Sequence, residues 1–529
     1  MYQTVEIKES LQKANQYVST GIEQILNGQV RESHGVSISP GATALATLAL
    51  LAIGRGFEVT QKRGAQWLWQ NKSAQGWGKF PGDEPDEEIT KIVRTVLQGS
   101  EGGWIARIRL IAQAKQFSRM ILSLGERVVS GLEGPTPEEI KFPKILEESV
   151  LKKLPLYGRP VVVAAALLTT ANNQIGIQQG VNYLLQTQTE NGSWAGDIVA
   201  TSMCILALLR FHGDNNRIQK AAIWLAQKQY QSGGWPAFDQ LQNWAIGWAI
   251  AIMSETDLLR DASWSKQALE WIKKAQNMDG SYGSTPPFTH PDLDDTAVAL
   301  IGIHQALGKT DGETVRLLKR LQNKDGSWGT FPSFKGTPPN IKCEFPVYIP
   351  SNDVTIHILE ALWQFDSQSK DSPIWRGLDW LLSQQGESGE YTSSWYEGPI
   401  YSTAQFLDLL SKWKFDWKRW QLAPRVAWAR RKSYKFLLTA QNEDGGWGSS
   451  VAETSLAISA LARYYGKVPK EVFKKGIGFI LNSQLEDGSF KPSYKGIYTQ
   501  GWNYEEPIAT ALTAIRALWR YSRIANIHY

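Results

Sequence analysis

The chain has 529 residues, of which 42% are hydrophobic and 20% are charged, and this balance excludes a disordered protein. Lys and Arg number 56 against 51 Asp and Glu, and the resulting net charge of +5 is too small to indicate nucleic-acid binding. The unusual feature is 23 Trp together with 46 Gly, which indicates a repeated need for large rings beside tight turns.

The start of the chain and its apolar runs indicate a cytoplasmic protein. Met1–Ser10 is charged and lacks the apolar core of a signal peptide. The longest apolar runs, such as Gly41–Gly54 and Val161–Leu168, fall short of the ~20 residues that span a bilayer. The two cysteines, Cys204 and Cys343, form neither a disulfide framework nor a paired metal motif.

One short pattern recurs along most of the chain: Gln, three residues, Gly, one residue and an aromatic residue. It occurs at Gln188-Gly192-Trp194, Gln229-Gly233-Trp235, Gln276-Gly280-Tyr282, Gln322-Gly326-Trp328, Gln385-Gly389-Tyr391, Gln441-Gly445-Trp447 and Gln484-Gly488-Phe490. Gln98-Gly102-Trp104 and a degenerate copy ending at Gly76-Trp77 extend the series. Most copies lie roughly 40–60 residues apart, the period of helix-pair repeats.

Each copy follows a stretch with helical spacing, and its Gly provides a turn because Gly reaches positive φ without steric cost. We therefore predict an all-α protein of stacked helical hairpins, either closed into barrels or left as an open solenoid. The periodicity does not decide between these two. We expect the repeated aromatic rings to pack over helix ends rather than to form a sugar-binding platform.

An acidic segment, Asp292-Leu293-Asp294-Asp295, runs directly into an apolar helix. The simplest interpretation is a helix N-cap, since carboxylates favour helix N-termini. Three carboxyl groups in four residues exceed what a cap needs, however. Like charges this close do not all ionise easily, so at least one is expected to keep its proton to higher pH and to be a candidate general acid.

A second polar segment, Ser351–His357, places Asp353 and His357 four residues apart on one helical face. His357 is compatible with an ordinary buried, hydrogen-bonded histidine or with a role beside the acid. The other five histidines have no comparable setting.

The stretch Lys412–Lys435 interleaves four Trp with nine Lys or Arg and a single Asp. A patch that contacts a membrane surface fits this composition. The alternative is a helix in which Trp413, Trp417 and Trp420, at positions i, i+4 and i+7, face the core and the basic face is solvated. We expect no nucleic-acid partner here.

Taken together, these motifs resemble those of class II terpene cyclases of the squalene–hopene cyclase type. The similarity covers the Gln-x-x-x-Gly-x-Trp repeats, Pro-Asp-Leu-Asp-Asp-Thr-Ala and Ser-Asn-Asp-Val-Thr-Ile-His, and thus nearly the whole chain. The resemblance implies that Asp294 protonates a terminal alkene and that Asp292 and Asp295 support it. It further implies that His357 binds and orients this acid, and that Asp353 belongs to the same network. A neutral carboxylic acid in a dry site suits this chemistry because an isolated alkene is a very weak base.

The resemblance also implies aromatic residues that face the substrate, since aromatic rings stabilise a carbocation without attacking it. The positions that match are Trp244, Trp395, Tyr401 and Trp502. At Trp244 the family often has Trp-Asp, whereas this chain has Ala245, which weakens the match there.

The domains implied by the resemblance are two α/α-barrels, a γ-like barrel over residues 20–220 and a β-like barrel over residues 221–529 that carries the acid, with the N-terminal helix 1–19 packing on the second. Because the chain is shorter than a typical squalene–hopene cyclase, we expect a prenylated aromatic (a meroterpenoid precursor) or another lipophilic isoprenoid no longer than squalene. A triterpene cyclase and a diphosphate-bearing diterpene cyclase stay open as alternatives.

No metal and no organic cofactor are expected. The Asp-Asp-x-x-Asp metal motif is absent, since Asp294-Asp295 is followed by Thr296, Ala297 and Val298. The acidic stretch Asp83–Glu88 imitates a magnesium site but is more simply a solvated loop. The sequence is compatible with peripheral membrane contact and with a homodimer.

Rival classes fit the sequence less well. A protein prenyltransferase would need a zinc site with an Asp-x-Cys pair, which neither cysteine provides. An α-barrel glycosidase would need a polar, sugar-lined cleft. A helical-repeat scaffold without activity leaves the acidic segment unexplained.

Overall fold

The computed structural model describes residues 2–99, 158–169, 174–211, 215–239, 241–285, 291–309, 311–331, 350–366, 372–412, 420–499 and 502–525. The predicted all-α fold is confirmed: helices dominate, and one short antiparallel hairpin joins β1 (Gly496–Thr499) to β2 (Trp502–Tyr504). Among the described helices, none combines the length and the apolar character needed to cross a membrane.

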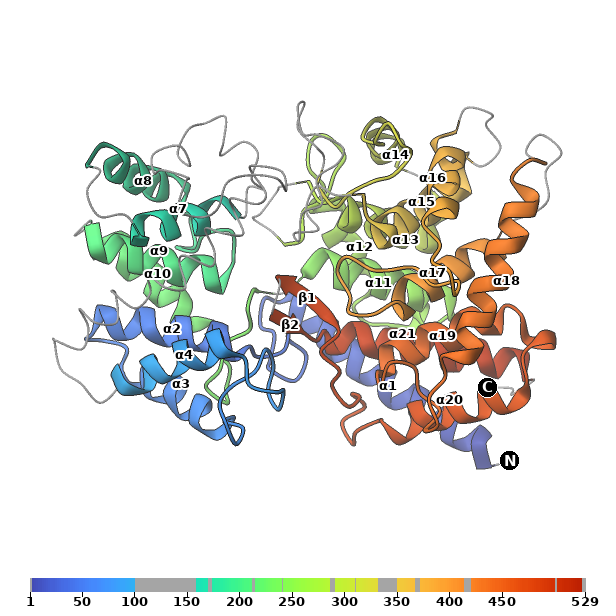
Figure 1. The fold of residues 1–529 in the computed structure, drawn as a ribbon, viewed down its shortest axis with the longest axis horizontal. Helices are drawn as coiled ribbons and strands as arrows, with labels where there is room; N and C mark the ends of the chain where they lie inside the picture. Colours follow the sequence, from blue (N-terminus) through green and yellow to red (C-terminus); the bar gives the residue numbers. More distant parts are fainter. Residues whose placement is uncertain are drawn as a thin grey trace.

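The helices form two lobes, each around its own buried hydrophobic cluster (Figure 1). The first lobe contains α2 (Pro40–Ile53), α3 (Glu58–Gln70), α4 (Glu87–Gly99), α7 (Gly158–Thr169), α8 (Gln174–Thr187), α9 (Ile198–Phe211) and α10 (Asn215–Gln227). Helices α2 and α9 are buried along nearly their whole length and pack on each other.

The second lobe is a closed double ring of helices. Its inner ring consists of α11 (Gln242–Glu255), α13 (Leu293–Leu307), α15 (Asn352–Asp366), α17 (Ile400–Ser411), α19 (Val451–Ala462) and α21 (Pro507–Ile524), each in contact with the next and α21 with α11. The amphipathic outer helices are α12 (Ser265–Lys274), α14 (Gly312–Arg320), α16 (Pro373–Ser383), α18 (Ala423–Thr439) and α20 (Lys470–Asn482). The choice between barrel and solenoid is thereby decided in favour of a barrel.

The N-terminal helix α1 (Tyr2–Leu26) belongs to the second lobe, although it precedes the first in sequence (Figure 1). It packs on α21, α11, α12 and α20, and its residues Ile7, Val18 and Ile22 join the second hydrophobic cluster. It therefore completes the outer ring.

The repeats link each hairpin to the next. In the copy at Gln322, the amide Nε2 donates to the carbonyl oxygen of Gly326 (2.7 Å) in its own turn and to that of Pro373 (2.8 Å) at the start of the next outer helix. The Trp328 indole N–H donates to Leu318 O (2.8 Å) and its ring is fully buried. The repeated tryptophans Trp194, Trp235, Trp328 and Trp447 are all fully buried, so they are structural, as predicted.

The last copy in each lobe closes that lobe. Gln484 Nε2 donates to Ser10 O of α1 (3.0 Å), and Gln229 Nε2 donates to Thr60 O of α3 (2.9 Å). Gln98 begins a copy that extends into residues 100–157, outside the described part of the chain.

The basic Trp-rich stretch is only partly described, because residues 413–419 lie outside the described residues. Trp420 and Trp428 expose 61% and 59% of their surface, so these two rings do not face the core. The core-facing alternative, which concerns Trp413, Trp417 and Trp420, is therefore wrong for Trp420, while the other two lie outside the described residues.

Candidate active site

The acidic segment forms the first turn of α13. Asp292 is the N-cap: its backbone is extended (φ −114°, ψ 117°), and its Oδ1 accepts hydrogen bonds from the backbone N–H groups of Asp294 (2.9 Å) and Asp295 (3.2 Å). The capping interpretation thus holds for Asp292. The other two carboxyl groups are not used as caps.

Asp294 is paired with His357. The Nδ1 atom of His357, on α15, lies 2.6 Å from Oδ1 of Asp294, on the neighbouring inner helix α13. His357 is fully buried, and the Asp294 side chain exposes 10% of its surface. The packing of α13 on α15 brings together two residues that are 63 positions apart in the sequence.

The second ring nitrogen of His357 faces α17. Gln405 Nε2 and Tyr401 Oη lie 3.2 Å and 3.3 Å from His357 Nε2. An amide NH₂ group only donates, so the Gln405 contact favours the neutral tautomer with its hydrogen on Nδ1. That tautomer donates to Oδ1 of Asp294 and leaves the other carboxyl oxygen free.

Asp353 holds the neighbouring loop. Its Oδ2 accepts hydrogen bonds from the backbone N–H groups of Ser394 (2.9 Å) and Trp395 (3.0 Å), and the Ser351 hydroxyl donates to its Oδ1. It therefore positions the segment that carries Trp395.

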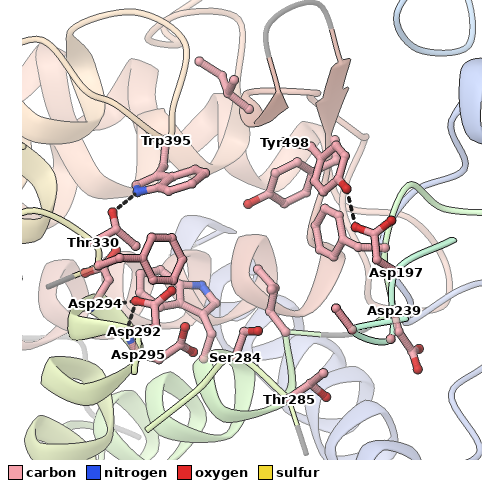
Figure 2. Close-up of a pocket in the computed structure, with 18 of the residues that line it drawn as sticks. Asp197, Asp239, Ser284, Thr285, Asp292, Asp294, Asp295, Thr330, Trp395 and Tyr498 are labelled. Atoms are coloured by element: carbon pink, nitrogen blue, oxygen red, sulfur yellow. Dashed lines mark hydrogen bonds between the residues drawn. The ribbon is translucent and has the colours of Figure 1, made fainter. Parts of the chain in front are cut away.

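A cavity between the two lobes contains the acidic segment (Figure 2). Asp292, Asp294 and Asp295 stand on one side of it, and Asp197 and Asp239 stand on the other. Most of the remaining wall is apolar or aromatic and includes Phe238, Leu241, Trp244, Phe331, Trp395, Tyr396, Ile497, Tyr498 and Tyr504.

The four aromatic residues expected at the substrate do not all line the same cavity. Trp244 and Trp395 line this cavity, and the Trp395 indole N–H donates to Thr330 Oγ1 (2.7 Å). Tyr401 instead lines a second cavity, in the interior of the second lobe, where it stacks on Tyr396 with ring centroids 3.7 Å apart.

The placement expected for Trp502 is not found. Its ring belongs to the hydrophobic cluster of the first lobe and fills the space beside Gly41 of α2, where a Cβ atom would lie 2.9 Å from the indole. Because Gly41 has no side chain, the indole packs there, and Tyr498 and Tyr504 of the hairpin provide the cavity wall.

Several residues of the site carry no recognisable signal in the sequence. Gln405 gives no signal of its own beyond its place on the same helix as Tyr401, four residues later. Tyr498, Tyr504 and Asp197 come from the hairpin and from the first lobe, and only the packing of the lobes brings them to the cavity. The hydroxyl of Tyr498 donates to Oδ2 of Asp197.

Two carboxyl groups of the acidic segment, those of Asp292 and Asp295, have raised pKa values. Burial raises the pKa of Asp292, and the nearby charge of Asp294 adds to it. Burial likewise raises the pKa of Asp295 well above its ordinary value, helped by Asp292 and Asp294, and its buried Oδ1 makes no hydrogen bond within the described residues. Burial lowers the pKa of His357, and the charge of an ionised Asp294 outweighs this, so the net pKa is raised; a protonated Asp294 lacks that charge, and the imidazole is then neutral.

The second cavity shares three aromatic residues, Trp244, Tyr396 and Tyr504, with the first. It also contains the carboxyl group of Glu506. Burial raises the pKa of Glu506 to about 8, and the adjacent Glu505 contributes in the same direction.

The raised pKa of Glu506 predicts a pH-dependent loss of stability. Between its ordinary pKa of about 4.5 and the folded value of about 8, the folded state binds the proton that the unfolded state has released, so the free energy of unfolding falls as pH rises. We expect Glu506→Gln, which cannot ionise, to gain stability relative to the wild type between pH 5 and pH 8. Urea unfolding at both pH values measures this difference, and a constant difference would contradict the assignment.

The acidic stretch at residues 83–88 lies before and within the start of α4. Oδ1 of Asp86 accepts a hydrogen bond from the backbone N–H of Ile89 (2.9 Å), which gives this carboxylate a capping role. In the part of the chain that the structure describes, no group of three or more His, Cys, Asp or Glu side chains is arranged to hold a metal ion.

Comparison with known proteins identifies the domains. Residues 286–500 match the squalene-hopene cyclase C-terminal domain, and residues 158–236 match the prenyltransferase alpha-alpha toroid domain. The squalene–hopene cyclase of Zymomonas mobilis is 27% identical over 162 residues, which cover 27% of this chain and 23% of that protein. The chain thus matches less than a quarter of the length of this relative.

Longer similarity connects the chain to bacterial diterpene enzymes. The copalyl diphosphate synthase of Streptomyces cyslabdanicus is 22% identical over 439 residues, which cover 76% of this chain and 77% of that protein. The solved structure of ent-copalyl diphosphate synthase from Streptomyces platensis superimposes on this chain with a TM-score of 0.59 at 16% sequence identity. The superposition covers 97% of this chain and 99% of that one, so the two share a fold. The two domain matches, the long similarity and the shared fold together support a class II terpene cyclase.

Proposed function

We propose that this protein cyclises a linear isoprenoid by protonating a terminal alkene with Asp294. The observation that carries the proposal is the Asp294–His357 pair at the wall of an aromatic-lined cavity. Oδ1 of Asp294 accepts the Nδ1–H of His357, so the carboxyl proton on the other oxygen is available to the alkene. The imidazole N–H and the N-terminus of α13 then stabilise the carboxylate that remains.

The aromatic rings support the later steps. Once the alkene is protonated, the positive charge moves along the chain as successive double bonds attack it. Trp244, Trp395 and Tyr504 offer aromatic faces to this charge, and such faces attract cations without adding to them. Burial raises the pKa of Tyr504 well above its ordinary value, so its hydroxyl stays neutral and is a poor nucleophile.

For the substrate, we propose a chain with an uncharged head group, most simply a prenylated aromatic. Five aspartates line the cavity, whereas Lys and Arg are absent from its wall among the described residues. A diphosphate carries several negative charges, and no Lys or Arg of the described wall balances them, while any ionised carboxyl group there repels it. The second candidate is nevertheless a diphosphate-bearing diterpene precursor, because the relatives with the widest coverage are named copalyl diphosphate synthases.

A panel of three substrates tests this proposal. We expect the purified protein to cyclise a farnesylated hydroxybenzoate in preference to geranylgeranyl diphosphate and squalene, with products identified by mass spectrometry and NMR. A preference for the diphosphate would favour the second candidate. Conversion of none of the three would reject the cyclase proposal.

Gln405 is expected to control the tautomer of His357. In Gln405→Leu, no amide donates to Nε2, so the tautomer with its hydrogen on Nε2 becomes accessible and Nδ1 accepts the carboxyl proton of Asp294 instead. We expect kcat to fall roughly 10- to 100-fold with little change in KM. Steady-state kinetics and a melting curve separate this effect from misfolding, and an unchanged kcat would contradict it.

A further inference from the structure

Glu506 is a buried carboxyl group to which the steps above assign no role. It occupies the N-cap position of α21, yet its side chain makes no capping hydrogen bond. It lines the second cavity together with Trp244, Tyr396, Tyr401 and Tyr504. Part of the surface of Glu506 is accessible, and Glu506 lines this cavity, so we take that accessible surface to face the cavity.

The position of Glu506 brings it near the acid. Trp244, Tyr396 and Tyr504 line both cavities, so the two spaces meet at these rings. The charge of Glu506 raises the pKa of both Asp295 and Tyr504, as expected of a carboxyl group close to the acidic segment. A cation held by the shared rings would therefore lie between Asp294 and Glu506.

A reaction that begins by adding a proton ends either by losing one or by capturing water. Aromatic rings are not bases, and the hydroxyls of Tyr396, Tyr401 and Tyr504 stay neutral because burial raises their pKa values. The neighbouring Glu505 is already engaged, since it accepts hydrogen bonds from the backbone N–H of Ser493 and from the Thr510 hydroxyl. Of these two adjacent glutamates of the second cavity, Glu506 is the one whose side chain makes no capping hydrogen bond.

We propose, on the basis of the function above, that the carboxylate of Glu506 ends the reaction by removing a proton from the carbon next to the last cationic centre. The C–H bond breaks, its electron pair becomes the new C=C bond, and the proton goes to a carboxylate oxygen. Asp294 has lost one proton and Glu506 has gained one, so the substrate is isomerised without net change in atoms. Proton transfer back to Asp294, directly or through solvent, restores the enzyme.

Two properties of Glu506 suit this role. A positive charge between the shared rings favours the carboxylate form at the moment when a base is needed. Burial raises the pKa of Glu506 to about 8, so the carboxylate that the step requires becomes populated as the pH approaches that value, and the group holds the proton firmly once it has received it.

The test compares Glu506→Gln with wild type on whichever of the three panel substrates the wild type converts. Because Asp294 is intact, we expect substrate consumption to fall less than tenfold. The fraction of the total product that is the wild-type alkene should fall at least tenfold. Other alkene isomers, or an alcohol formed by water capture, should replace it. Glu506→Asp, which keeps the carboxylate, should restore part of the wild-type alkene.

Glu360→Gln is the matched control. Glu360 is a largely enclosed glutamate of α15 that pairs with Lys412 (2.7 Å) and lines neither cavity. Its removal should leave the product pattern unchanged.

The outcomes separate the two proposals. An unchanged product pattern in Glu506→Gln overturns the role of Glu506. The same holds if Glu506→Gln folds but consumes no substrate, or if the wild-type product is an alcohol. A wild type that converts none of the three substrates rejects the cyclase function itself.

Discussion

Replacing Asp294 by Asn is expected to lower the cyclisation rate by at least about 10³-fold, the upper range of what a positioned general acid contributes. The amide is nearly the same size and still accepts the Nδ1–H of His357, so the pair at 2.6 Å is preserved. A carboxamide, however, is far too weak an acid to protonate an alkene. The fall should appear in kcat, measured by product formation under substrate saturation.

Asp311→Asn is the matched control for this variant. Asp311 caps α14, since its side chain accepts a hydrogen bond from the backbone N–H of Glu313, and it does not line either cavity. Asn caps helices about as well as Asp, so activity should be retained; stability should fall modestly, because Oδ2 of Asp311 also accepts from Gln276 Nε2 and Thr314 Oγ1 and an amide nitrogen does not accept. An Asp294→Asn variant that still cyclises substrate at a comparable rate would exclude Asp294 as the acid.

Replacing Trp328 by Ala is expected to destabilise the second lobe by about 3–5 kcal/mol, the usual cost of deleting a large buried aromatic ring. The ring is fully buried, and its indole N–H donates to Leu318 O at 2.8 Å. The substitution leaves a cavity beside Leu318 of α14 and Gly377 of α16, and it removes the partner of a buried carbonyl group. Urea unfolding followed by circular dichroism measures the loss.

Trp420→Ala provides the contrast. Trp420 exposes 61% of its surface, so its removal opens no internal cavity and should change the unfolding free energy by no more than about 0.5 kcal/mol. Equal effects of the two substitutions would mean that the repeated tryptophans do not stabilise the barrel.

The sequence alone determined the class of fold, because its evidence is local. The repeats combine helical spacing, a glycine turn and an aromatic ring within a few residues, and these predict helical hairpins wherever they occur. At Gly326, for instance, φ is +99° and an added Cβ atom would lie 2.5 Å from Arg376 O, so the turn requires the glycine that the pattern shows. The acidic segment was recognisable for the same reason, since its three carboxyl groups lie within four residues.

Only the tertiary structure decided which residues meet. His357 is four residues from Asp353, yet it bonds to Asp294 on another helix, and its tautomer depends on Gln405 of a third. Helical spacing places a residue on a face but does not say which face of a neighbouring helix it meets. Trp502 shows the limit: the family resemblance implied a place at the cavity wall, but its ring packs beside Gly41 in the first lobe. Glu506 became a candidate only when burial among aromatic rings separated it from the many glutamates of the surface.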